Sequence, residues 1–147
     1  MKTLIAVLLT TVLMTCVSLA ETVNFDNTDI GKPPAALKLI QTIPLPGVTG
    51  RFDHFAIDAK GHRLFVAALG NNTLEVLDIA AGKHLKSIAG LHKPTGVLYL
   101  ASPDQIAVAS GDDGTFKVFD GASYDVVKSL GSLDDADNVR FAPKAGT

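Results

Sequence analysis

Residues 63–78 have the sequence RLFVAALGNNTLEVLD, and residues 105–120, which follow at a shift of 42, have the sequence QIAVASGDDGTFKVFD. Each stretch holds two runs rich in apolar and β-branched residues around a short turn of Gly, Asn or Asp, which is the pattern of a β-hairpin. The same shift relates Phe55 to Val97 and Val139, and Thr73 to Thr115. Constant spacing over separate segments indicates an internal repeat of 42 residues.

Each repeat contains four such runs with turn residues between them. They cover residues 54–58, 63–69, 73–79 and 84–89 in the first unit, and residues 96–100, 105–110, 115–120 and 126–130 in the second. Asn72 and Gly114 correspond in the central turns, and both suit a positive φ. A four-stranded repeat of about 40 to 45 residues is the blade of a β-propeller. The sequence therefore predicts an all-β fold, a β-propeller of four-stranded antiparallel blades in an incomplete ring.

The register also divides the chain. We expect a partial propeller over residues 37–147, with residues 54–89 as the first blade, residues 96–130 as the second, and residues 138–147 as the start of a third. Residues 37–43 align with the fourth run of a unit and are predicted to be the leading strand of a closing blade. Terminal blades expose apolar faces, so we expect the isolated fragment to self-associate.

The amino-acid sequence of the repeat resembles that of a known family. Residues 63–78 are similar to the YVTN-type propeller repeat, although Phe65 stands where that repeat has tyrosine and Ala68 where it has asparagine. The resemblance covers residues 37–147. It implies a seven-bladed ring in the full family member, and a secreted or periplasmic location with diverse functions.

The N-terminus has the layout of a secretory signal. Lys2 precedes an uncharged apolar run over residues 4–17, and Ser18 and Ala20 follow it. We expect residues 1–20 to be a signal peptide, residues 21–36 to be a linker, and the mature protein to be periplasmic or extracellular without a membrane span. A lipoprotein acylated at Cys16 is the alternative, but Thr15 fits that signal poorly.

Charge excludes one class of partner. The chain has 13 Lys and Arg against 15 Asp and Glu, and its formal net charge is −2. No basic face for nucleic acid is evident, and we expect no nucleic-acid partner. Cys16 is the single cysteine and lies in the predicted signal, so a disulfide or a thiolate metal site within the mature chain is excluded.

The repeat places candidate ligand-binding residues at one end of the blades. The connection into the first strand and the turn between the second and third strands share a face of the disc, where propellers bind ligands. The candidates are polar residues that the register stacks around this rim of the channel. They are Arg51, Asp53, His54, His92, Lys93, Asp137 and Asn138.

Other interpretations of these residues stay open. An Asp or Asn before a strand also organises the turn through hydrogen bonds to the backbone, and this structural role is favoured for Asp53, Asp137 and Asn138. Only His54 and His92 share a face among the histidines, which is too few for zinc. The acidic residues of this face lack the spacing of a calcium loop. We therefore expect no metal and no cofactor.

The leading functional hypothesis is an exported binding or scaffold propeller that presents this rim to a protein or small molecule. It is a non-catalytic hypothesis, because no nucleophile elbow, phosphate loop, dinucleotide fingerprint or HExxH helix is present. The alternative is a fragment of a periplasmic propeller enzyme or of a redox-enzyme subunit, lactonase-like or dehydrogenase-associated.

Overall fold

The computed structural model describes residues 37–131 and 133–142. The chain divides into Met1–Lys38 and Leu39–Thr147, and the description below concerns the second unit. The predicted signal peptide (residues 1–20), the linker (residues 21–36) and residues 143–147 of the third repeat lie outside the described residues. Within the described ranges, no helix has the length and hydropathy needed to span a membrane.

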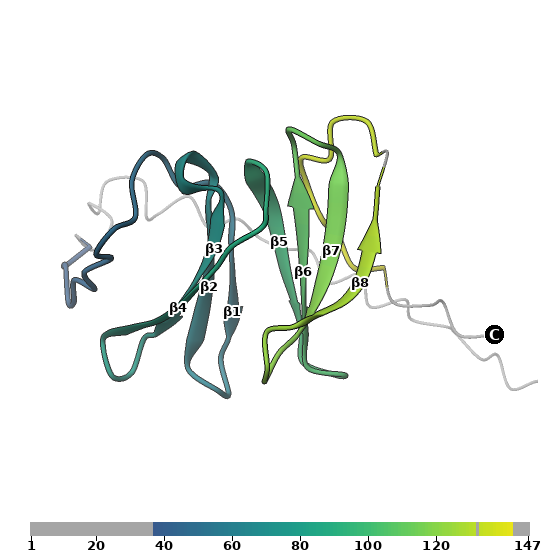
Figure 1. The fold of residues 1–147 in the computed structure, drawn as a ribbon. Coiled ribbons are helices and arrows are strands. Elements are labelled where there is room, and N and C mark those ends of the chain that lie inside the picture. The colour runs from purple at the N-terminus through teal and green to yellow at the C-terminus, as the bar shows by residue number, and fades with distance from the viewer. Residues whose placement is uncertain (1–36, 132, 143–147) are drawn as a thin grey trace, which may run out of the picture. The chain divides into compact units, whose positions relative to one another are not determined.

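Two four-stranded antiparallel sheets make up the described chain (Figure 1). In each sheet the strands follow sequence order, β1-β2-β3-β4 and β5-β6-β7-β8, as consecutive hairpins produce. The first sheet contains β1 (Phe55–Asp58), β2 (Arg63–Ala68), β3 (Thr73–Asp78) and β4 (Lys83–Ile88), and the second contains β5 (Pro94–Leu100), β6 (Gln105–Ser110), β7 (Thr115–Asp120) and β8 (Val126–Leu130). A short 3-10 helix, η2 (Leu69–Asn71), lies between β2 and β3.

Positive-φ residues set the central turns. Asn72 has a φ of 60° and Gly114 also has a φ of 60°, as their equivalent places in the repeat predict. The left-handed conformation is open to Gly at no steric cost and to Asn at a small one. Both turns can therefore reverse the chain between the second and third strands of their sheets.

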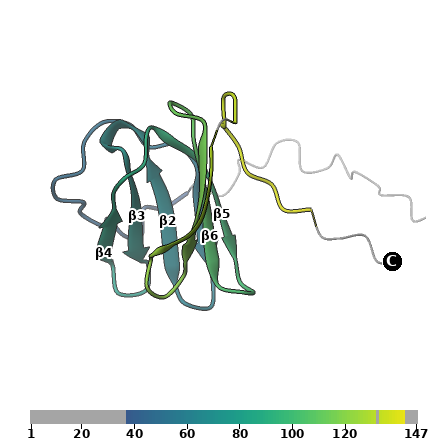
Figure 2. The same ribbon diagram turned by 45° about the vertical axis from the view of Figure 1, so that its right-hand side comes forward.

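The main core lies between the two sheets, where β5 packs against β1 and β2 (Figures 1 and 2). Alternation along each strand directs one set of apolar side chains to this interface and the other set to the opposite face. Phe65 stacks on Tyr99 with ring centroids 5.4 Å apart. The buried residues of the core are Phe65, Ala67, Leu74, Val76, Ile88 and Leu91 from the first repeat and Val97, Ile106, Val108 and Phe119 from the second.

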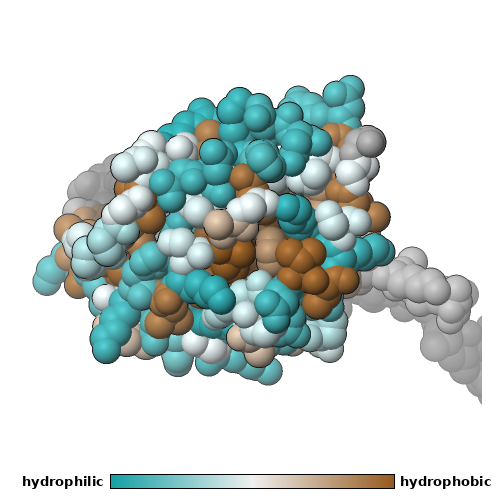
Figure 3. All heavy atoms as spheres, in the orientation of Figure 1, coloured by the Kyte–Doolittle hydropathy of each residue, from teal (hydrophilic) through white to brown (hydrophobic). Residues whose placement is uncertain are grey.

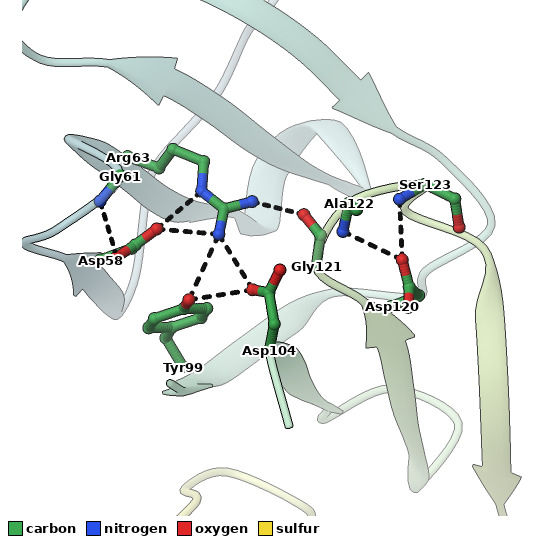
Figure 4. A network of polar contacts seen from close by, with 9 residues as sticks. All are labelled: Asp58, Gly61, Arg63, Tyr99, Asp104, Asp120, Gly121, Ala122 and Ser123. Carbon is green, nitrogen blue, oxygen red and sulfur yellow. Dashed lines mark hydrogen bonds and ion pairs between the residues drawn. The ribbon is translucent and has the colours of Figure 1, made fainter. Parts of the chain in front are cut away.

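A polar cluster ties the sheets together at the end where β1 turns into β2 (Figure 4). We call it the Arg63 cluster: Arg63 and Asp58 of the first sheet with Tyr99, Asp104 and Gly121 of the second. The Arg63 guanidinium donates to Asp58 Oδ2 at 2.9 Å, to Asp104 Oδ1 at 3.0 Å and to the Gly121 carbonyl. Tyr99 donates its hydroxyl to Asp104 Oδ1 at 2.9 Å.

The Arg63 cluster shifts the ionisation of its members. Burial works to raise the pKa of Asp58, but the hydrogen bond from the Gly61 N–H and the hydrogen bond and charge of Arg63 outweigh it, so the pKa lies below its ordinary value. Burial raises the pKa of Tyr99, and its hydrogen bond to Asp104 raises it further. The buried carboxylate of Asp58 is thus held in its charged form.

Beyond shifts of one residue at the bounds of β1, β2, β3 and β4, the structure departs from the expected strands in three places. Residues 37–43 form no strand, since strand hydrogen bonds need a neighbour and none of the described residues pairs with them. Residues 138–142 of the expected third blade also carry no strand. Finally, β5 begins at Pro94 instead of residue 96, because an irregularity lets Pro94 pair with Ser110 ahead of the regular ladder.

Candidate ligand-binding rim

Three chain segments from successive repeats meet at one end of the sheets. The His54 N–H donates to the Thr95 carbonyl at 3.3 Å, which joins the start of β1 to β5. Thr95 Oγ1 donates in turn to the Ala136 carbonyl at 2.9 Å. A Cβ added to Gly96 would stand 3.0 Å from the Asn138 Cα, so glycine at this position permits the close approach. These contacts define the rim as residues 51–54, 92–96 and 136–138.

The first group of rim side chains surrounds Asp53. Arg51 Nη2 lies 3.4 Å from Asp53 Oδ2, and His54 Nδ1 lies 2.8 Å from Asp53 Oδ1. His54 Nδ1 has no hydrogen-bond partner among the described residues, so the second contact is a close approach of two polar groups. Arg51 is 70% exposed, which leaves its guanidinium open to solvent and to a ligand.

The second group joins the segment before β5 to the turn between β6 and β7. Lys93 Nζ lies 2.6 Å from Asp112 Oδ1, and His92 Nε2 lies 3.9 Å from Asp113 Oδ2. The Lys93 N–H donates to Asn72 Oδ1 at 2.8 Å, which fixes this segment against the first sheet. Lys93 is therefore paired with a carboxylate within the protein, and His92 lies near another.

Hydrogen bonds within the turn between β6 and β7 lower the pKa of Asp113. Burial works to raise its pKa, but Thr115 donates to Asp113 Oδ1 from its hydroxyl at 2.7 Å and from its N–H at 3.1 Å. These bonds, with the nearby charge of His92, bring the pKa of Asp113 below its ordinary value.

The third group lies in the last described segment. Asn138 Oδ1 accepts the Val139 N–H at 2.9 Å and also accepts from Arg140 Nη1. The bond to Val139 is the turn-organising contact that the alternative interpretation of Asn138 requires. Asp137 is exposed beside it.

The seven candidate residues thus fall into three groups rather than one pocket. The sequence did not single out Arg140 or Asn72 as residues of the site, nor did it assign Asp112 and Asp113 as partners of Lys93 and His92. A signal for Arg140 was present, because the two preceding repeats have Ala56 and Leu98 at this place. A charge at a place that is otherwise apolar calls for a partner or a function.

An acidic cavity adjoins the second group. Its volume is about 360 Å³, and its lining consists of Gly111, Asp112, Asp113, Gly114, Leu133, Asp134 and Asp135. Among residues 37–131 and 133–142, no three His, Cys, Asp or Glu side chains are placed to hold a metal ion. The cavity therefore adds negative charge to this end of the molecule, next to Lys93 and His92.

A buried cluster in the first sheet contains a serine, a histidine and a carboxylate. Glu75 is fully buried and accepts from Thr73 Oγ1, from Ser87 Oγ at 2.6 Å and from His84 Nε2 at 2.7 Å. Ser87 Oγ also approaches His84 at the same nitrogen, Nε2, at 3.3 Å. In a nucleophilic triad the two ring nitrogens serve the acid and the nucleophile separately. Here Ser87 Oγ and His84 Nε2 both bond to Glu75 Oε2, so the arrangement holds Glu75 in place and differs from that of a triad.

Comparisons with known proteins address the fold. No family profile matches the chain, and no curated protein matches it. Solved structures do match: hydrazine synthase of Kuenenia stuttgartiensis has a TM-score of 0.51 and 21% identity over 56% of this chain and 24% of its own. Apo AztD from Citrobacter koseri has a TM-score of 0.55 and 18% identity over 67% of this chain and 27% of its own.

Both solved structures are β-propeller-type proteins. The described chain has a β-propeller fold. Its two sheets are two consecutive four-stranded blades of an incomplete ring, as the 42-residue repeat predicts. The chain covers about a quarter of the length of either solved structure. At these identities the likeness concerns the fold alone.

Proposed function

We propose that this chain is part of an exported β-propeller that binds a protein or a small molecule at its rim. The observation that carries the proposal is the meeting of residues 51–54, 92–96 and 136–138 from three successive repeats. Loops presented by a rigid sheet scaffold are common binding sites. Here they combine exposed Arg51 and Lys93 with the carboxylates of Asp53 and Asp112, so the rim offers hydrogen-bond donors and acceptors together.

Membership of the YVTN-type propeller family is part of this proposal. It is supported by the 42-residue spacing and by the similarity of residues 63–78 to the family repeat. The structure of the two blades is compatible with it, because residues 63–78 form the β2–β3 hairpin that the repeat describes.

Export is supported by the sequence of residues 1–20. Intact-mass measurement of the secreted product tests it, and cleavage after Ala20 is the expected result. A mature chain that begins with an acylated Cys16 would instead identify a lipoprotein.

Two rim variants test the binding function. We expect that ligands can be found by screening a small-molecule library with a thermal-shift assay. The affinity of these ligands should fall about tenfold in His54→Ala and in Asp137→Ala, because each variant loses one polar contact. Asp125→Ala is the matched control, since Asp125 is exposed in the turn between β7 and β8 at the opposite end of the blade. Unchanged affinity with a lowered melting temperature would assign these residues a turn-structuring role and refute the proposal.

The enzymatic alternative has one observation in its favour, which is that hydrazine synthase contains the same fold. A shared fold does not carry an activity, because function depends on the residues of the site. The binding role is therefore preferred for the described residues.

A further inference from the structure

A second cavity lies along the inner strands. Its volume is about 390 Å³, and it is lined by three equivalent residues from each of three successive repeats. We call it the inner-strand groove, and its residues are Phe55, Ala56, Ile57, Val97, Leu98, Tyr99, Val139, Arg140 and Phe141. In a propeller the first strand of each blade borders the central channel, so this groove belongs to the channel wall. Figure 3 views the molecule from the other side, that of β4 and β8, where hydrophobic residues stand among mostly hydrophilic ones.

Large apolar side chains are exposed in this groove. Phe55 is 70% exposed, Phe141 is 63% exposed and Ile57 is 55% exposed. By contrast, Val97 and Tyr99, which occupy the equivalent positions of the second repeat, pack on the first blade. Exposed apolar surface at a concave place marks a site that buries something apolar.

Arg140 gives the groove its polarity. It is the one charged residue among those that line the cavity. Its Nη1 donates to Asn138 Oδ1 and, at 3.2 Å, to the Val139 carbonyl. Both bonds use Nη1, and among residues 37–131 and 133–142 no group accepts from Nε or Nη2, so these two nitrogens can donate to a ligand. A guanidinium edge of this kind matches the two oxygens of a carboxylate.

We propose that the inner-strand groove binds an amphipathic carboxylate. The apolar body of the ligand lies against the exposed side chains of Phe55 and Phe141, and its carboxylate accepts from Arg140. Asn138 positions the guanidinium through the hydrogen bond to Nη1. The site differs from the rim in place and in chemistry, so either proposal can fail while the other stands.

Calorimetric titration with three probes of equal chain length tests the ligand class. Octanoate, octanol and octyltrimethylammonium differ in charge and share the same apolar tail. We expect octanoate to bind most tightly to the protein. Arg140→Gln should weaken octanoate about tenfold and leave octanol unchanged, because only the carboxylate uses the guanidinium. Phe55→Ser should weaken both, since each loses apolar contact.

Two controls locate the site. Lys128→Gln removes an exposed cation from β8, outside the groove, and should leave octanoate binding unchanged. His54→Ala should also leave it unchanged, which separates the groove from the rim. Since Phe55 and Arg140 are exposed, both groove variants are expected to keep the melting temperature of the parent protein.

Three results would overturn the proposal. Equal affinity for octanoate and octanol would reduce the groove to apolar surface without charge recognition. Tighter binding of octyltrimethylammonium than of octanoate would show that the acidic residues near the rim, and not Arg140, determine which charge is bound. Loss of self-association in Phe55→Ser, with no octanoate binding in the parent, would make the groove a contact between copies of the chain.

Discussion

Arg63 Nη2 lies 3.0 Å from Asp104 Oδ1, and this ion pair joins the second strand of the first blade to the turn between β5 and β6 of the second. Arg63 is only 16% exposed and also holds the buried Asp58. The repeat places Gln105 where Arg63 stands and Leu100 where Asp58 stands, so the next blade has no such pair. The Arg63 cluster is therefore specific to the interface between these two blades.

Removing Arg63 should destabilise the protein strongly. Arg63→Met keeps much of the side-chain volume but leaves Asp58 buried without its cation, and we expect a loss of about 3 kcal/mol in the free energy of unfolding. Urea unfolding measures it. Arg51→Met is the matched control, because Arg51 forms an exposed pair that contributes less than about 1 kcal/mol. Equal losses in the two variants would mean that the Arg63 cluster does not hold the blades together.

Acid should weaken the same interface. The pKa of Asp58 is lower in the folded protein than in the unfolded chain, so between the two values the unfolded chain binds more protons. The stabilisation is therefore complete above the ordinary Asp pKa near 3.8 and is lost as the pH falls through the folded value.

Unfolding curves between pH 6 and pH 3, a range about the ordinary Asp pKa, test this expectation. Asp58→Asn should be less stable than the parent at pH 6 and should lose less stability on acidification. The remaining pH dependence belongs to groups such as Asp113, whose pKa is also lowered. The expectation would be wrong if the variant and the parent lost stability in parallel.

Close backbone packing at the rim should make Gly70 intolerant of a side chain. A Cβ at this position would stand 2.7 Å from the Arg51 nitrogen and 2.7 Å from the Gly50 Cα. Gly70→Ala must push residues 50 and 51 away and is expected to cost about 1 to 3 kcal/mol. Gly131→Ala is the control, because nothing lies within 4 Å of its added Cβ. Thermal unfolding compares the two, and an equal melting temperature would contradict the expected clash.

Exposed apolar side chains on both blades should make residues 21–147 self-associate. Phe55 and Ile57 on the first blade and Leu130 on the second are exposed apolar residues. In the core, the equivalent face of the second blade is covered by the first. Size-exclusion chromatography over a range of protein concentrations measures the association. A single monomeric peak with one cooperative unfolding transition would show that these faces need no cover.

The repeat in the sequence was enough to predict both blades. Residues 105–110, 115–120 and 126–130 were expected as strands, and β6, β7 and β8 have these bounds. The positive φ of Asn72 and Gly114 was also predictable, because it depends on a few neighbouring residues and on the geometry of one hairpin. Strand alternation and turn residues are local properties of the sequence. Because they recur in each repeat, the pattern is easier to recognise.

The sequence predicted where the rim lies but not which of its side chains pair with one another. The register located residues 53–54, 95–96 and 137–138 at equivalent positions, and the structure brings their backbones together. It could not assign Lys93 to Asp112, because that pair joins side chains from two different connections. Which long side chain reaches which partner depends on rotamers and on the distance between connections.

The sequence by itself determined the antiparallel blades and the turns between their strands. Tertiary structure alone decided that Arg63 pairs with Asp104, that Arg140 lies in an apolar groove, and that residues 37–43 form no strand. Local conformational preferences are encoded within a few residues and need no knowledge of distant partners. Ion pairs between blades and the pairing of an isolated strand depend on segments that meet only after the sheets have packed.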